Sequence, residues 1–237
     1  MRTRLSVPTL LVTLIALTGC DGPFSTLDPA GPAANSVAWL WWAMFGFSTV
    51  VLIAVTALWL YAIKRQAPEA EAEEGRAQKI QNRWVLWGGF ALPVGSITLL
   101  LAFGIPIGHS MLPLTPDDGD ALRIEVTGHQ WWWEVHYPNS GITLTDEVHI
   151  PANTPVDVHL TSSDVIHSFW VPRLAGKVDM LPGRTNVLRL EADEAGTYRG
   201  SCAEFCGVGH AHMQFTVTAH EPEAFADWKQ EMTGGDE

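Results

Sequence analysis

Two long apolar stretches dominate the first half of the chain. Positions 37–63 and 84–107 contain no charged residue. At about 1.5 Å of rise per helical residue, each can cross the roughly 30 Å apolar core of a bilayer. The pattern predicts two transmembrane helices in a lipid bilayer, over 37–63 and 84–109. A buried helical hairpin in a soluble protein is the less favoured interpretation.

The second half alternates short apolar runs with turn signals rich in Pro, Gly and Asn, which is typical of β-structure. The closing run 222–232 predicts a short helix with Phe225 and Trp228 on one face. The predicted fold class is a two-helix transmembrane hairpin followed by an all-β sandwich or small barrel and a short C-terminal helix. The predicted strands are 122–126, 131–137, 142–150, 155–160, 186–191, 196–200 and 214–218.

The first residues have the pattern of an export signal. Segment 1–19 has a basic start, an apolar run and small residues before Cys20. The string LTGC resembles the lipobox of bacterial lipoproteins, so we predict that Cys20 becomes a lipid-modified N-terminus. An ordinary export signal is the alternative. The mature chain is then expected to begin with an extracytoplasmic segment, 20–36.

Basic residues indicate the orientation. The connector 64–83 contains five Lys and Arg residues, whereas 20–36 contains none. Positive residues concentrate on the cytoplasmic side of membrane spans, so the connector is predicted to be cytoplasmic and 110–237 to be an exported domain. This domain has twenty acidic and seven basic residues. Such a charge favours a basic docking partner over simple solvation, and no nucleic acid is expected to bind.

Segment 201–215, SCAEFCGVGHAHMQF, carries the strongest chemical signal. Thiolate, imidazole and thioether donors suit copper better than magnesium or calcium, which prefer oxygen. Zinc also uses Cys and His but seldom Met. A short disulfide is the alternative for the CxxxC pair, but it requires neither the His nor the Met. Copper is favoured, with the candidate residues Cys202, Glu204, Cys206, His210 and Met213.

One more ligand is expected, because a loop closing on itself would leave the metal open on one side. The string DVIHSFW offers His167, just after a predicted strand. The remaining histidines are interpreted as structural, although His212 lies inside the loop and is the least secure. They are His109, His129, His136, His149, His159, His212 and His220.

Four motifs occur together and in order: GHQWWW from position 128, DVIHSFWVP from 164, KVDMLPGR from 177 and GSCAEFCGVGHAHM from 200. With them the chain resembles subunit II of cytochrome c oxidase, in the haem-copper oxidase family. The resemblance covers nearly all of the mature chain. It implies a cupredoxin-like fold for 110–237.

The resemblance also implies a dinuclear copper A centre, with two copper ions bridged by the thiolates of Cys202 and Cys206. One copper would take His167 and Met213. The other would take His210 and a backbone carbonyl. The implied copper ligands are thus His167, Cys202, Cys206, His210, Met213 and the carbonyl of Glu204.

Further roles follow from the same resemblance. The Glu204 side chain is expected to bind a magnesium ion shared with subunit I, and Trp131 to receive electrons from cytochrome c. Strand alternation puts Trp131 and Trp133 on one face, so the sequence alone does not tell which is exposed. Subunit I would use the electrons to reduce O2 to water, coupled to proton translocation, and subunit III is a further expected partner. The implied location is the bacterial inner membrane, with the domain on the periplasmic side.

One departure and two alternatives accompany this interpretation. Family members with a proton path beneath subunit II have a glutamate near the start of the second span, where this chain has Gln81 and Asn82. A proton-uptake role is therefore in doubt. A quinol-oxidising relative keeps the fold but lacks the copper ligands that are intact here. A copper-delivery lipoprotein could use the same donors, but two spans and Trp131 fit it poorly.

Overall fold

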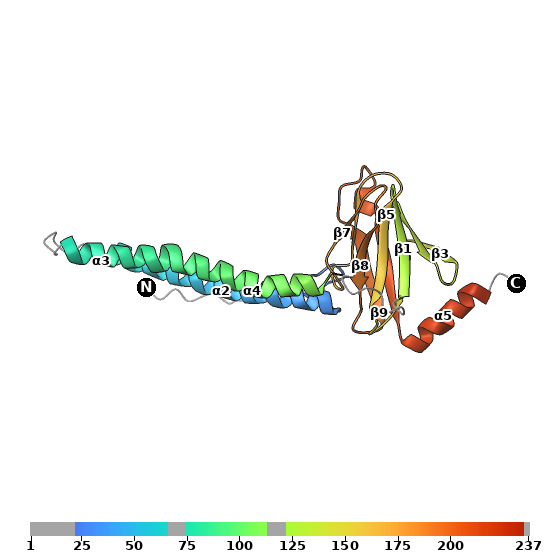
Figure 1. Cartoon of the computed structure of the whole chain (residues 1–237), viewed down its shortest axis with the longest axis horizontal. Helices are drawn as coiled ribbons and strands as arrows, with labels where there is room; N and C mark the ends of the chain where they lie inside the picture. Colours follow the sequence, from blue (N-terminus) through green and yellow to red (C-terminus); the bar gives the residue numbers. More distant parts are fainter. Residues whose placement is uncertain (1–21, 66–73, 113–121, 235–237) are drawn as a thin grey trace, which may run out of the picture. The chain divides into compact units, whose positions relative to one another are not determined.

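The computed structural model describes residues 22–65, 74–112 and 122–234 (Figure 1). They fall into two compact units. One is Trp39–Ser110, and the other joins the chain before Trp39 to the chain after Ser110. The predicted signal segment 1–19 and Cys20 lie outside the described residues.

The first unit is a helical hairpin. Trp39 and Phe103 pack edge to face across it, with ring centroids 6.3 Å apart. Pro32–Lys64 and Ala77–Ser110 are both long and apolar enough to cross a membrane, and their apolar windows are not buried within the protein. Outward-facing apolar side chains suit a lipid environment. The elements are α2 (Pro32–Lys64), α3 (Glu74–Trp84), the π-helical turn η2 (Val85–Ala91) and α4 (Leu92–Ser110).

The second helix begins earlier than the apolar pattern suggests. Helix α3 starts at Glu74. Three basic residues of the predicted connector therefore lie within a helix: Arg76, Lys79 and Arg83. Pro93 lies two residues after the end of the widened turn η2. A proline has no N–H to donate, which favours such local widening of the helical hydrogen-bond pattern.

The second unit is built on two five-stranded sheets (Figure 1). One has the order β3-β2-β1-β5-β8 and the other β4-β10-β9-β6-β7. The pairs β1/β5 and β4/β10 are parallel, and the other pairs are antiparallel. The strands are β1 (Leu122–His129), β2 (Trp132–Tyr137), β3 (Ile142–Thr145), β4 (Glu147–Pro151), β5 (Val156–Ser162), β6 (His167–Trp170), β7 (Val178–Met180), β8 (Asn186–Leu190), β9 (Gly196–Cys202) and β10 (Gln214–His220).

Alternating side chains of the strands fill the core between the sheets. In β2 every second residue is buried, which is the period expected of a half-buried strand. The rings of Trp133, Phe169 and Phe215 pack together with centroids 4.4–5.8 Å apart. The predicted fold class is thereby confirmed: a helical hairpin, an all-β sandwich and a short C-terminal helix, α5 (Pro222–Gly234).

The prediction of one strand over 142–150 is wrong. The structure divides it at Asp146, whose φ of 59° is left-handed, so that β3 joins one sheet and β4 the other. Aspartate adopts this conformation more readily than most residues. Its carboxylate accepts a 2.8 Å hydrogen bond from the N–H of Trp133, while its own N–H donates to the Trp133 carbonyl. These bonds fix the crossing between the sheets.

The segment that leads into α2, including its first residues, belongs to the β unit. The N–H of Ala30 donates to the carbonyl of Arg173, and the N–H of Asp193 donates to the carbonyl of Ala30. Arg173 also pairs with Asp28 at 2.9 Å. Gly31 is held so closely that an added Cβ would clash with two backbone carbonyl oxygens. We call residues 28–34 the N-terminal strap.

Helix α5 packs on a pair of histidines. Trp228 stacks on the ring of His149, with centroids 4.3 Å apart and an interplanar angle of 6°. The Nδ1 of His149 lies 2.8 Å from the Nε2 of His220, on the neighbouring strand. Burial lowers the pKa of both histidines. At His149 the nearby His220 lowers it further, against the opposite effect of Glu147.

We predict that acidification loosens α5. A histidine whose pKa is lowered in the packed state takes up protons more readily once α5 detaches, so packing weakens as the pH falls below about 6.5. Each proton taken up contributes a slope of at most about 1.4 kcal/mol per pH unit. Hydrogen exchange of the α5 amides, corrected for intrinsic rates, measures this in the full chain in detergent.

The variant His220→Gln should flatten this pH dependence, because one titrating ring and its bond to His149 are removed. His159→Gln, on β5 of the other sheet, is the matched control and should keep the slope. An α5 exchange rate that does not change between pH 7 and 5 in the wild type would refute the prediction.

Candidate metal centre

The candidate site lies where three strands of one sheet meet. Cys202 ends β9 and Met213 immediately precedes β10. The N–H of Cys202 donates to the carbonyl of Met213 at 2.9 Å, and the ladder continues with Ser201 opposite Gln214. The loop 203–212 is therefore closed at its base by antiparallel pairing. Strand β6 pairs with β9 on the other side, which brings His167 beside Cys202.

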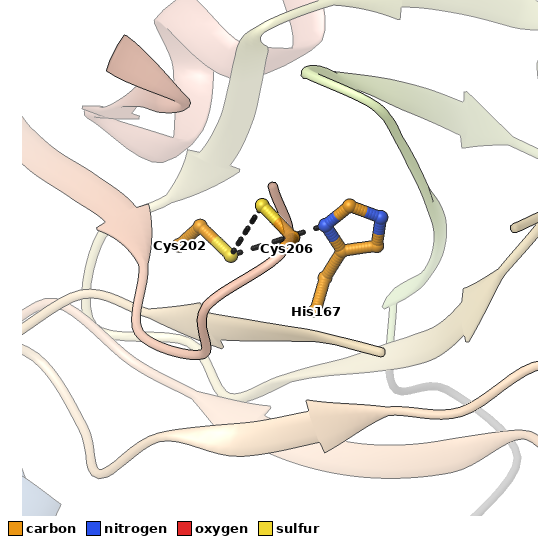
Figure 2. Close-up of side chains that lie close together, drawn as sticks. All are labelled: His167, Cys202 and Cys206. Carbon is orange, nitrogen blue, oxygen red and sulfur yellow. Dashed lines mark hydrogen bonds between the residues drawn. The ribbon is translucent and has the colours of Figure 1, made fainter. Parts of the chain in front are cut away.

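Two free, buried cysteines form the centre of the site (Figure 2). Their Sγ atoms are 3.8 Å apart. A disulfide bond is about 2.05 Å long, so the two sulfurs are not bonded to each other. The Nδ1 of His167 lies 3.9 Å from the Sγ of Cys202, and both side chains point into the same space.

The remaining predicted ligands surround the same two sulfurs. The Nδ1 of His210 is 3.6 Å and the Sδ of Met213 is 3.7 Å from the Sγ of Cys206. His210 begins a short 3-10 turn, η3 (His210–His212). The carbonyl oxygen of Glu204 lies 3.2 Å from the Sγ of Cys202. All six residues that the sequence analysis selected are thus brought together.

The site disfavours ionised thiols when no cation is present. Burial raises the pKa of Cys206 to about 12, and the adjacent Cys202 contributes to the rise. Two buried thiolates side by side need positive charge between them, and a metal ion supplies it while releasing the protons. The donors are two thiols, two imidazole nitrogens, a thioether and one carbonyl. This soft set fits copper.

A carboxylate that the sequence analysis did not select lies behind His167. The Nε2 of His167 is 2.8 Å from Oδ1 of Asp164. Partial burial raises the pKa of Asp164, but hydrogen bonds from His167 and from two backbone N–H groups outweigh it, and the net pKa lies below the ordinary value. A carboxylate behind a histidine ligand orients its ring. The motif DVIH held this signal, but only its histidine was assigned a role.

Trp131 lies over the cysteine loop. It belongs to the turn before β2, not to the strand, so the predicted alternation with Trp133 does not apply. Trp131 is 38% exposed, whereas Trp133 is fully buried. The indole Nε1 of Trp131 donates to the carbonyl of Cys206 at 3.2 Å. The exposed indole is thus one hydrogen bond away from the chain of a candidate ligand.

Two side chains of the loop take no part in the cluster. His212 is exposed. Glu204 is half-buried, and only its carbonyl contacts Cys202. Its side-chain role at a magnesium ion stays a prediction, as does lipidation at Cys20, which lies outside the described residues.

Comparison with known proteins points to one family. The profile of the family described as cytochrome C oxidase subunit II, periplasmic domain, matches residues 140–220. The chain is similar to cytochrome c oxidase subunit 2 of Alkalihalophilus pseudofirmus, with 34% identity over 96% of this chain and 68% of the relative. It is also similar to ubiquinol oxidase subunit 2 of Acetobacter aceti, with 29% identity over 96% of this chain and 75% of that relative.

A solved structure is similar as well. The periplasmic domain of subunit II of cytochrome oxidase (CoxB) of Bradyrhizobium japonicum has 32% identity and a TM-score of 0.46, over 48% of this chain and 94% of that chain. The identity to the Alkalihalophilus subunit, over most of both sequences, shows that this chain belongs to the cytochrome c oxidase subunit II family.

Proposed function

We propose that this chain is the copper-bearing subunit II of a membrane cytochrome c oxidase. In this role it accepts electrons from cytochrome c at a dinuclear copper A centre and passes them to subunit I, where O2 is reduced to water with proton translocation. The observation that carries the proposal is the convergence of four further donor groups on two buried, unbonded sulfurs.

The protein part of this function is to hold the donors still. Bound copper would supply a one-electron carrier shared between the two thiolates. The ladder at the base of the loop fixes Cys202 and Met213, and β6 fixes His167 against the opposite side. Burial keeps water away from Cys202, Cys206 and Met213. Rigid, dry surroundings keep the ligand positions similar in both redox states, which lowers the cost of reorganisation.

Trp131 is proposed as the point where electrons arrive. Its exposed indole can touch a docked donor, while its N–H bonds the backbone of Cys206. The acidic domain favours a basic partner such as cytochrome c through charge steering.

The membrane arrangement follows the same proposal. Residues 37–63 and 84–109 would span the inner membrane, with connector 64–83 in the cytoplasm and 110–237 in the periplasm. Subunit I would share a magnesium ion at the Glu204 side chain, and subunit III would complete the complex.

The quinol-oxidising alternative leaves the donor set without a purpose, although a quinol oxidase subunit is among the relatives. A copper-delivery protein would need only one copper ion at a time. The number and type of copper ions therefore discriminate among these functions.

Copper reconstitution of the full chain in detergent tests the proposal. The wild type should bind two copper ions and give an electron paramagnetic resonance spectrum of one electron shared by two equivalent nuclei. Cys206→Ser should reduce the copper content to one ion or none and abolish this spectrum, because one bridging thiolate is lost.

The control is His212→Gln, which removes an exposed imidazole from the same loop and should keep both ions. A wild-type chain that binds a single copper ion, or a Cys206→Ser chain with the unaltered spectrum, would contradict the proposal.

Trp131→Ala should slow electron uptake without changing the copper content. An exposed tryptophan at a docking surface typically contributes at least about 1 kcal/mol, so the second-order rate constant should fall about fivefold or more. Stopped-flow reduction of the copper-loaded chain by reduced cytochrome c measures this constant.

Trp132→Ala is the matched control. That ring stacks on His129 with centroids 4.2 Å apart and lies on β2. The Trp132→Ala variant should leave the rate constant for reduction by cytochrome c nearly unchanged. Equal rates for Trp131→Ala and the wild type at matched ionic strength would remove Trp131 from the route.

A further inference from the structure

Asp164 connects two parts of the site that are far apart in sequence. Its Oδ1 accepts hydrogen bonds from the Nε2 of His167 at 2.8 Å and from the N–H of Val165 at 2.6 Å. Its Oδ2 accepts a 2.7 Å bond from the backbone N–H of Gln130. One carboxylate thus holds both a candidate metal ligand and the turn that carries Trp131.

The bond to His167 fixes which nitrogen faces the sulfurs. An ionised carboxylate only accepts hydrogen bonds, so Nε2 must carry the proton. The lone pair of Nδ1 is then directed at the space beside Cys202, 3.9 Å from its Sγ. Carboxylates behind metal-binding histidines commonly set the tautomer and the ring orientation in this way.

The bond to Gln130 holds the tryptophan turn from one side, and Cys206 holds it from the other. The Nε2 of Gln130 donates to the carbonyl of Cys206 at 2.7 Å, and the Nε1 of Trp131 donates to the same oxygen at 3.2 Å. The indole lies so close to the loop that a Cβ added at Gly209 would collide with its ring. The turn therefore has little room to move while Asp164 stays in place.

We propose that Asp164 is a positioning residue that couples the pose of the Trp131 turn to the pose of His167. This inference rests on the proposed function, because it assigns Trp131 and His167 to one electron route. Through Asp164, ordering of His167 by a metal stiffens the turn, and a displaced turn disturbs the imidazole.

The variant Asp164→Asn separates the two bonds. An amide has one oxygen and one NH2 group, so it can accept from His167 or from Gln130 but must present donors to the other. If the oxygen stays with His167 and Val165, which together supply two bonds, the Gln130 N–H loses its acceptor. The rate of hydrogen exchange of the Gln130 backbone N–H should then rise about tenfold or more, as expected for loss of a bond to a charged acceptor.

The exchange experiment uses the full chain in detergent, without metal and after copper loading. Copper should slow hydrogen exchange of the Gln130 backbone N–H in the wild type and should not do so in Asp164→Asn. The copper content of the variant should stay at the wild-type value, while its rate of reduction by cytochrome c falls toward that of Trp131→Ala.

Asp179→Asn is the matched control for the loss of one negative charge. Asp179 lies on β7 opposite Ser168 of β6, is half exposed and pairs with Lys177 at 3.6 Å. It should change neither Gln130 exchange nor the rate. Similar effects of the two variants would mean that charge alone is involved, and would overturn the proposal.

A second variant covers the case in which Asp164→Asn does not fold. Gln130→Ala removes only the side-chain bond to Cys206 and leaves the carboxylate with His167. Because the backbone N–H at position 130 keeps its bond to Asp164, copper loading of this variant should still slow hydrogen exchange of that N–H. Exchange at this position that does not respond to copper would overturn the coupling. If the wild type binds no copper pair, the proposed function fails. Hydrogen exchange of the Gln130 backbone N–H in metal-free Asp164→Asn still decides whether Asp164 holds the turn. A rate equal to that of the metal-free wild type refutes this role of Asp164.

Discussion

The constraint on which the site depends is the burial of two thiols side by side without a bond between them. Such a pair resists ionisation, since each thiolate would lie in a dry space next to the other. The fold nevertheless holds Cys202 and Cys206 in place, by pairing the ends of their loop and covering it with β6 and the Trp131 turn. A site that opposes negative charge and yet offers two sulfurs, two imidazoles and a thioether is suited to a soft cation.

Much of this could be predicted from the sequence, for local reasons. Four donors lie within one loop, so their residue types indicate a metal before any fold is known. His167 is different, because its approach depends on β6 pairing with β9. Its place after a predicted strand made it a candidate, and only the resemblance to a family supported that choice. The hydrogen bonds from Gln130 to Asp164 and to Cys206 join residues 34 and 76 positions apart, which no local pattern reveals. The break at Asp146 was hidden because the apolar positions on both sides of it, 142, 144, 148 and 150, keep the same two-residue period.

Similarity of the whole chain does not separate the two kinds of oxidase in this family. A cytochrome c oxidase subunit and a ubiquinol oxidase subunit are 34% and 29% identical to it, each over 96% of its length. The donor set itself consists of a few residues on β6, at the end of β9 and in the loop before β10. Function is thus carried by the site, and the fold supplies only the frame.

The N-terminal strap has a consequence for how this domain can be produced. Residues that precede the first span supply hydrogen-bond partners to Arg173 and Asp193 and cover the backbone beside Leu174. A soluble fragment that starts after the second span lacks these partners, so that backbone groups normally paired would meet water or a neighbouring molecule. A fragment of the β unit faithful to the intact chain should therefore carry residues 22–38 as well, joined to the domain by a linker in place of the two helices.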